Sequence, residues 1–420
     1  MTKSPSISTQ SNHSDAELIS SVAEAISVPR SIAADSFVLH APLELLARGA
    51  LLPWVAPEQR DAALRNIASL ATEYAAFSDG IGTPRIVDFP SCATAVRTFA
   101  RAIRDNDLDT TDSVAVWFAT HCTPTEIATL LADTVAPSLA AAAHGSIFLY
   151  LLPRVHAHRG PALAMLRPLA RELARHSQLE LTWQNRVGCD TPEGHPIGAT
   201  IDDSGALRAA LEAVPRLGLP GSDFIFPIMH QVVATGMVQD LLTDTVTKVT
   251  IGGARAVVLR AAAAAMLHEH SEHAAYGWSH ALTMPQAVLG LATQSQHPQR
   301  LIAIATTYAV GFRAAFSKAP IAWNYAPERV NFTTDQAIAA GADRAVAAAA
   351  AFHEYGTYPG AVRQCLATYA AIQSDAHLVK YVLASFDAAS DDPTYAATYI
   401  AAAASLCSYW THRHAMTGTT

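Results

Sequence analysis

Lys380 is the residue whose type and setting are best suited to unusual chemistry, and it is one of only four lysines in 420 residues. It lies among Val379, Val382 and Leu383 in an apolar stretch with helical character. Lysine can lose its proton when it is buried, whereas arginine effectively cannot. A helix would place His377, three residues earlier, on the same face. The pair could therefore share a ligand or act in acid–base catalysis, although many such lysines bury only the stem.

Histidines form the second set of candidates, because the chain contains 18 of them and imidazole is the commonest protein ligand for transition metals. Besides His377, three histidines stand among apolar or small residues: His40, His144 and His280. A single histidine of this kind is usually a core residue with its hydrogen bonds satisfied. Four of them together with an apolar lysine favour a metal site inside a helical bundle.

A separate histidine cluster occupies the run His268-Glu-His270-Ser-Glu-His273. It differs from the H-E-x-x-H motif of zinc proteases by one position, because Glu272 stands where the motif requires histidine. Two glutamates in so short a run are more typical of a solvated turn, and we favour that interpretation. His273 lies two helical turns before His280, which makes it an alternative metal ligand.

Several catalytic signatures are missing from the sequence. It contains no G-x-S-x-G elbow, no Walker A loop and no G-x-G-x-x-G that follows a strand, which disfavours hydrolases and dinucleotide-binding folds. The pair Asp391-Asp392 is followed at once by Pro393, as at a helix start, so an aspartate-rich isoprenoid synthase motif is also disfavoured.

Helices must position these candidates, because apolar residues at helical spacing dominate the chain. The clearest helical segments are 61–77, 123–143, 160–176, 300–316, 334–353 and 393–412. Many of them begin with capping side chains, early prolines or acidic first turns. Only 179–183 and 245–251 have strand character. The sequence predicts an all-α fold, a large multi-helix bundle with at most a minor β element.

The composition fits one large domain, because half of the residues are hydrophobic and only 15% are charged. We expect residues 1–14 to form a disordered tail and residues 15–420 to form a single domain. If the chain has two halves, their boundary is expected in the Gly- and Pro-rich segment 190–227. The net charge of -8, without a basic run, argues against a nucleic-acid partner.

The cysteines and the N-terminus indicate a cytoplasmic protein. The five cysteines are never in a C-x-x-C pair, which predicts reduced core residues at Cys92, Cys122, Cys189, Cys365 and Cys407. The N-terminus lacks the apolar core of a signal peptide, and no apolar run approaches membrane-spanning length. No membrane partner is expected, and the sequence does not indicate an oligomeric state.

Taken in chain order, the candidate residues resemble the questin oxidase family. The resemblance covers positions 40 to 380 and rests on His40 beside Pro42 and Leu43, His144-Gly145, His280-x-x-Thr283 and Asp375-x-His377-x-x-Lys380. Members of this family are oxygenases that open a ring of anthraquinone or related polyketide skeletons, by Baeyer–Villiger-type oxidation or carbon–carbon cleavage. An iron-dependent relative has a site of four histidines and a carboxylated lysine.

The resemblance implies a ligand set for Fe(II). The neutral ligands would be His40, His144, His280 and His377, and the fifth would be Lys380 as a carbamate formed with CO2. Burial would favour the free amine that captures CO2, and the carbamate would supply an anionic oxygen. One position would remain for O2 or a substrate oxygen. Leu39 departs from the pattern, because fungal members tend to carry Asn before the first histidine.

Three hypotheses about function fit these residues. The first is a non-haem iron oxygenase that acts with O2 on an aromatic or quinone-like molecule, in a pocket with candidate residues Trp183, Trp278, Phe226 and Tyr276. The second is a metal-free, NADPH-dependent Baeyer–Villiger-type oxidase that uses Lys380 and His377 in acid–base catalysis. The third is a non-enzymatic helical binding protein whose histidines are structural.

Overall fold

The computed structural model describes residues 9–155, 160–187, 202–217 and 225–417. Within these residues the chain forms nineteen α-helices and no strand, which confirms the predicted all-α bundle. The β structure is limited to two isolated bridges, Arg30 with Gly80 and Ser138 with Glu180. The strand character of 245–251 was misleading, because Val246 ends one helix and Thr250 caps the next.

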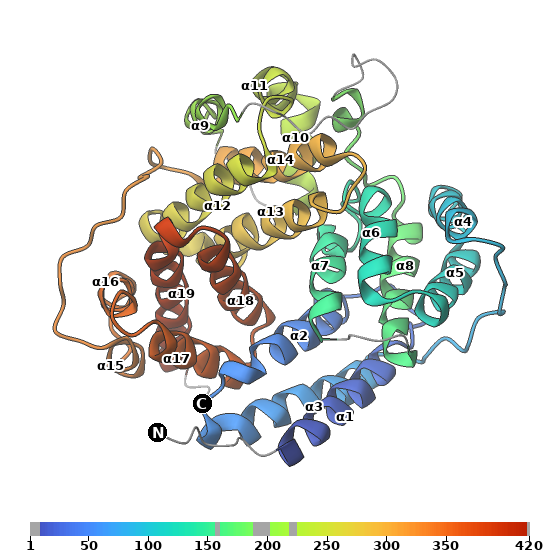
Figure 1. The fold of residues 1–420 in the computed structure, drawn as a ribbon, viewed down its shortest axis with the longest axis horizontal. Helices are drawn as coiled ribbons and strands as arrows, with labels where there is room; N and C mark the ends of the chain where they lie inside the picture. The colour runs from blue at the N-terminus through green and yellow to red at the C-terminus, as the bar shows by residue number, and fades with distance from the viewer. Residues whose placement is uncertain (1–8, 156–159, 188–201, 218–224, 418–420) are drawn as a thin grey trace, which may run out of the picture.

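The helices follow one another in three groups (Figure 1). The N-terminal group comprises α1 (Thr9–Ile26), α2 (Ser36–Leu51), α3 (Arg60–Ala76), α4 (Cys92–Arg104), α5 (Leu108–His121), α6 (Pro124–Val135), α7 (Gly145–Val155) and α8 (Leu166–Arg175). The middle group comprises α9 (Ser204–Glu212), α10 (Ile225–Ala234), α11 (Met237–Val246), α12 (Ile251–His268), α13 (Ser279–Ala292) and α14 (Pro298–Phe316). The C-terminal group comprises α15 (Thr334–Ala339), α16 (Arg344–Tyr355), α17 (Pro359–Ile372), α18 (Ala376–Asp391) and α19 (Ala396–Thr417).

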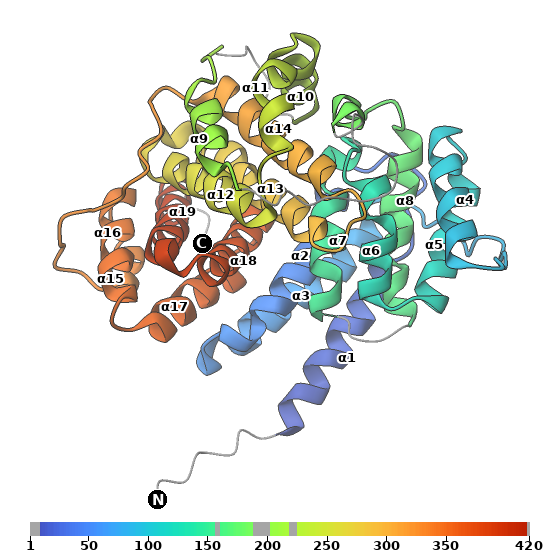
Figure 2. The same ribbon diagram turned by 45° about the horizontal axis from the view of Figure 1, so that its top comes forward.

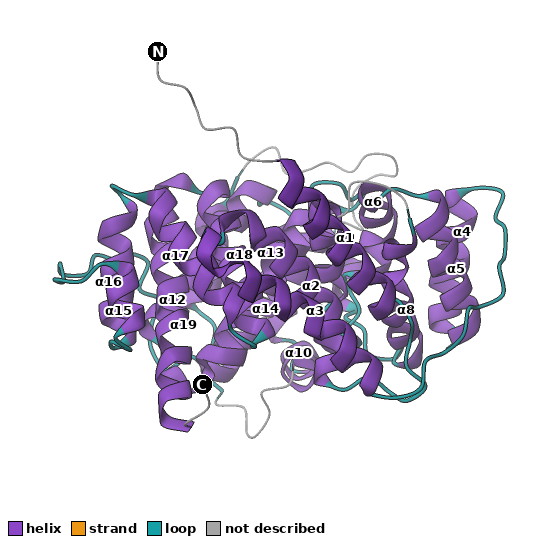
Figure 3. Ribbon diagram, turned by 90° about the horizontal axis from the view of Figure 1, so that it is seen from below, coloured by secondary structure: helices purple, strands orange, loops and turns teal. Residues whose placement is uncertain are grey.

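Helices α12, α13 and α14 run across the upper part of the molecule in Figure 1 and contact both other groups, and α9, α10 and α11 pack on their outer side (Figures 1 and 2). Seen from below, helices fill the body of the protein (Figure 3). Two long described loops, 77–91 and 317–333, run along its opposite ends. The centre of the molecule is therefore enclosed by helices from all three groups.

Two predicted helices are interrupted. The expected helix 123–143 ends at Val135, and Ala141–Ala143 instead form a tight turn with φ between 50° and 58°. The expected helix 334–353 is divided into α15 and α16, because Gly341 between them has φ 61°. Both breaks require the left-handed backbone region. Gly341 is a usual signal for such a helix end, whereas the alanines 141–143 give no such signal.

The expected tail and domain boundary fall partly outside the described residues. Helix α1 begins at Thr9, inside the segment 1–14, and residues 1–8 are not described. The segment 190–227 contains α9, but its stretches 190–201 and 218–224 are also outside the described residues. The single-domain organisation therefore stays a prediction.

The described cysteines are all free, and Cys122 and Cys407 are buried as expected. Cys92 corrects the expectation of a buried set, because it is exposed at the start of α4, whose buried positions begin with Ala95. Cys189 lies outside the described residues. Helix α12 is long and apolar enough to cross a membrane by length and composition, contrary to the sequence expectation, but most of it is buried among other helices.

Candidate metal centre

Four helices contact one another in a closed ring at the centre of the protein: α2 with α7, α7 with α13, α13 with α18, and α18 with α2 (Figure 1). Three of these helices carry a predicted histidine within their first two turns, and the fourth, α7, has one directly before its first residue. These are His40 of α2, His144 before α7, His280 of α13 and His377 of α18. Lys380 follows on α18, and all five side chains are buried. The fold thus brings the five predicted ligands to one region.

Aspartate caps hold the starts of α2 and α18. Asp35 accepts a hydrogen bond from the backbone N of Val38 at 2.9 Å. Asp375 accepts from the backbone N of His377 at 2.8 Å and of Leu378 at 2.9 Å. These bonds satisfy N–H groups that a first helical turn leaves unpaired. The cap of α18 therefore fixes the backbone of a candidate ligand directly.

His144 is presented by the left-handed turn Ala141–Ala143. This conformation costs an L-residue about 1–2 kcal/mol, so the turn is strained. Gly145 follows and permits close approach of α7 to α6, because a Cβ at this position would lie 2.5 Å from Cγ1 of Val135. The direction of His144 therefore depends on backbone features that local helix propensity does not predict.

Backbone carbonyl groups orient two of the imidazoles. Nδ1 of His40 donates to the carbonyl oxygen of Ser36 at 2.5 Å, and Nδ1 of His280 donates to that of Tyr276. A carbonyl can only accept, so the proton is on Nδ1 and the lone pair is on Nε2 in both rings. Metal-binding histidines are commonly fixed by a hydrogen bond of this type.

The four imidazoles lie against one another. The ring centroid of His40 is 4.5 Å from those of His144 and His377, and the His280 centroid is 4.9 Å from that of His377. The Nε2 atoms of His144 and His280 are 3.2 Å apart. Two nitrogens bound at right angles to one ion at about 2.1 Å would be about 3 Å apart, so this separation is compatible with a shared metal.

Four nitrogen atoms of the cluster are buried without a hydrogen-bond partner among the described residues: His40 Nε2, His144 Nδ1, His377 Nδ1 and Lys380 Nζ. Asp375 is 3.6 Å from Nδ1 of His377, which is too far for a hydrogen bond. Buried polar atoms are seldom left unsatisfied in native proteins. The ligand nitrogens of His40, His280 and His377 lie within 4.8 Å of one another, so a cation bound between them would account for the unpartnered atoms of His40 and His377. This donor set suits iron, zinc, copper or nickel.

Burial favours the uncharged forms of the cluster. It lowers the pKa of all four imidazoles well below the ordinary value, and nearby positive charge, including that of Lys380, lowers it further. Burial also lowers the pKa of Lys380 to about 7, while Asp375 and Glu44 act in the opposite direction. Neutral imidazoles bind metals, and a neutral amine can react with CO2, so both forms suit the predicted site.

A cavity of about 1050 Å³ opens onto the four histidines. This volume is at the upper end of the range for small-molecule sites. Its lining includes Phe37, Phe226 and Tyr276, and the Tyr276 ring lies edge-on to His377 with centroids 4.8 Å apart. Two of the four predicted pocket aromatics, Phe226 and Tyr276, therefore line the cavity.

The other two predicted pocket aromatics belong to the core. Trp183 is 4% exposed and donates from Nε1 to Oγ1 of Thr307 at 2.9 Å. Trp278 is 1% exposed and packs edge-on against Phe316 with ring centroids 5.9 Å apart. Their burial corrects the expectation that they contact a substrate.

The histidine run 268–273 lies apart from this cavity. His270 is exposed, as expected for a solvated turn, but Glu269 is buried and accepts from the backbone N of Lys318 at 2.9 Å. His273 stacks on Phe316 with centroids 4.2 Å apart and is not among the described residues that line the cavity. The geometry favours the original four histidines over His273.

Glu44 is a site residue that the sequence reasoning missed. It lines the cavity one turn after His40, and the spacing of four residues was the available signal. Arg48 donates from Nε to Glu44 at 2.8 Å and from its other nitrogens to the carbonyl groups of Ala371 and Gln373 at 2.6 Å. Burial raises the pKa of Glu44, and Arg48 opposes this shift.

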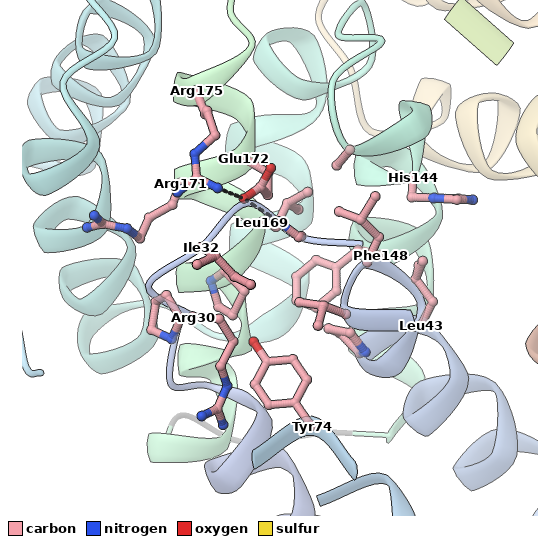
Figure 4. Close-up of a pocket in the computed structure, with 17 residues that line it drawn as sticks. Arg30, Ile32, Leu43, Tyr74, His144, Phe148, Leu169, Arg171, Glu172 and Arg175 are labelled. Atoms are coloured by element: carbon pink, nitrogen blue, oxygen red, sulfur yellow. Dashed lines mark hydrogen bonds and ion pairs between the residues drawn. The ribbon is translucent and has the colours of Figure 1, made fainter. Parts of the chain in front are cut away.

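A second, much smaller pocket of about 30 Å³ adjoins the segment that leads into α2 (Figure 4). Leu39, His144 and Glu172 line both pockets. In Figure 4 the ring of His144 points away from the small pocket, and His144 also lines the larger cavity. Arg175 pairs with Glu172 at 2.7 Å on this side.

Comparison of the chain with models of protein families, with curated proteins and with solved structures gives no match. The resemblance to questin oxidases therefore stays a prediction from the residues.

Proposed function

We propose that this chain is a non-haem iron oxygenase of the questin oxidase type that acts on an aromatic or quinone-like small molecule. The supporting observation is a buried cluster of four imidazoles that line a large cavity, three of which have an unpartnered nitrogen atom. The choice of Fe(II) comes from the resemblance, and the imidazole donors are compatible with it.

In this proposal the ion would be held by the four histidines and by Lys380 as its carbamate. Iron supplies the redox chemistry with O2. The carbonyl groups of Ser36 and Tyr276 keep two imidazoles in the tautomer that binds metal. Asp375 holds the backbone of His377, and the apolar cavity walls exclude water from the reacting groups.

The lining disfavours the NADPH-dependent alternative. Phosphate groups are usually bound by Arg, by Lys or by free N–H groups at a helix N-terminus. None of the described residues that line the cavity is Arg or Lys. Asp35 and Asp375 already accept hydrogen bonds from the first turns of α2 and α18. The metal-dependent hypothesis needs no phosphate site and fits this lining better.

Metal content tests the proposal. Untagged protein purified without oxygen would be subjected to elemental analysis as wild type, His280→Ala and Lys380→Ala. Exposed His270 and Lys318 supply matched controls as His270→Ala and Lys318→Ala. We expect nearly one iron per chain in the wild type and controls and a loss of most iron in both site variants, with the helical circular dichroism spectrum retained.

Oxygen consumption with a panel of quinones then tests activity in the same samples. A folded wild type without metal would contradict the proposal and favour a non-enzymatic binding protein. Full iron content and activity in Lys380→Arg would disprove the carbamate, because a guanidinium does not form one under these conditions.

A further inference from the structure

We infer that the large cavity selects an uncharged, multi-ring molecule that carries no anionic group away from its reacting ring. This inference depends on the proposed function only in treating the cavity as the substrate site. It rests on the charges and the apolar surface around that cavity.

The charged residues in the described lining are acidic: Asp35, Glu44, Glu172 and Asp375. Two of these carboxylates are paired with arginines outside the lining, Glu44 with Arg48 and Glu172 with Arg175. The Arg175 side chain lies on the side of the smaller pocket (Figure 4). These cations are therefore already engaged and do not face a molecule in the large cavity.

The remaining two carboxylates cap helices. Asp35 and Asp375 occupy N–H groups at the starts of α2 and α18, where an anion would otherwise bind. His176 also lines the cavity, but its Nε2 is 3.8 Å from Glu172, so any positive charge on it has a carboxylate nearby. Away from the histidine cluster, a substrate anion would therefore meet carboxylates and lose its hydration without gaining an Arg or Lys partner in the described lining.

The rest of the lining favours flat apolar groups. Phe37, Phe226 and Tyr276 contribute aromatic surface, and Leu139 and Ile225 contribute aliphatic surface. A cavity of about 1050 Å³ accommodates several fused rings. Carboxylate oxygens accept hydrogen bonds, so neutral hydroxyl or amide donors on such a molecule are compatible with the lining.

Two probes of similar size test the charge preference: 2-(hydroxymethyl)anthraquinone and anthraquinone-2-sulfonate. Their dissociation constants would be measured anaerobically by fluorescence quenching on wild-type protein, both as purified and after iron removal. We expect the neutral probe to bind the iron-free form about ten-fold or more tightly than the sulfonate does, because the described lining has no Arg or Lys for the sulfonate.

The variant Phe226→Lys adds a cation to the lining at a half-buried position where the lysine stem can lie on apolar surface. It should improve sulfonate binding about ten-fold and reduce the preference for the neutral probe. Tyr358→Lys is the matched control, because Tyr358 is 62% exposed and is not among the lining residues. The control should retain the wild-type preference.

Equal binding of both probes to the wild type, tighter binding of the sulfonate, or no binding of either probe would overturn the inference. The proposed function fails separately. Wild-type protein that is purified without iron and shows the expected preference would disprove the oxygenase and keep the inference. Protein that is purified with iron, but whose iron-free form prefers the sulfonate, would have the opposite meaning.

Discussion

Replacement of Lys380 with methionine should stabilise the metal-free protein near neutral pH while it removes a candidate metal ligand. Burial lowers the pKa of Lys380 from an ordinary value of 10.5 to about 7. Between these values the unfolded chain binds a proton that the folded chain does not. The unfolding free energy of the wild type therefore falls as the pH is lowered from 10.5 to 7.

The size of this effect follows from the two pKa values. Each pH unit well between them corresponds to 1.36 kcal/mol and the slope halves at each pKa, so burial of Lys380 costs about 4 kcal/mol at pH 7 relative to pH 10.5. Methionine has similar length and no charge, and it removes this cost. The variant should exceed the wild type in unfolding free energy by about 4 kcal/mol at pH 7, about 2 kcal/mol at pH 9 and nearly zero at pH 10.5.

Urea unfolding of chelator-treated protein in CO2-free buffer, followed by circular dichroism from pH 7 to pH 10.5, measures this difference. Titrating groups far from Lys380 are common to both proteins and cancel in the comparison. The imidazoles that Lys380 affects have pKa values well below the ordinary value, so they are neutral throughout this pH range. Lys318→Met is the control, because Lys318 is exposed and should give no pH-dependent difference. A difference that does not change with pH, or a variant less stable than the wild type at pH 7, would refute the reasoning about Lys380.

Two further sets of substitutions, measured by urea unfolding, test the Glu44–Arg48 ion pair and the left-handed turn that precedes His144. Arg48→Met leaves the Glu44 carboxylate buried without its partner and should cost about 3–5 kcal/mol, whereas Arg48→Met combined with Glu44→Leu should recover most of the loss. A loss below about 1 kcal/mol in the single variant would contradict a structural role for the pair. Ala142→Gly relieves a left-handed alanine and should stabilise the protein by about 1 kcal/mol, whereas Ala209→Gly in α9 should destabilise it by a similar amount. Equal destabilisation by both glycines would argue against strain in the turn.

The sequence identified parts of the site that local rules govern. The spacing from His377 to Lys380 places both on one face of α18, and the apolar neighbours of Lys380 correctly indicated a buried amine. The same rule would have found Glu44 from His40. Helical periodicity likewise identified most of the long helices, because it reports burial of one helix face.

Other features depend on contacts between distant segments and have no local signal. The proximity of His40 to His377 follows from packing of α2 on α18, and only the order of motifs in a resemblance indicated it. The turn Ala141–Ala143 has a sequence typical of a helix, but tertiary structure imposes another conformation. The β-branched run 245–251 has threonine at a helix cap, where its hydroxyl group accepts a backbone hydrogen bond.

The ring of α2, α7, α13 and α18 also determines when this site can form during synthesis. A ribosome makes His40 early, but its partners on α13 and α18 appear only after most of the chain has been made. A complete donor set therefore exists only once these distant helices have packed together. Stable retention of an ion by all five residues would report that the whole molecule has folded, and a fragment that ends before α18 would lack two of them.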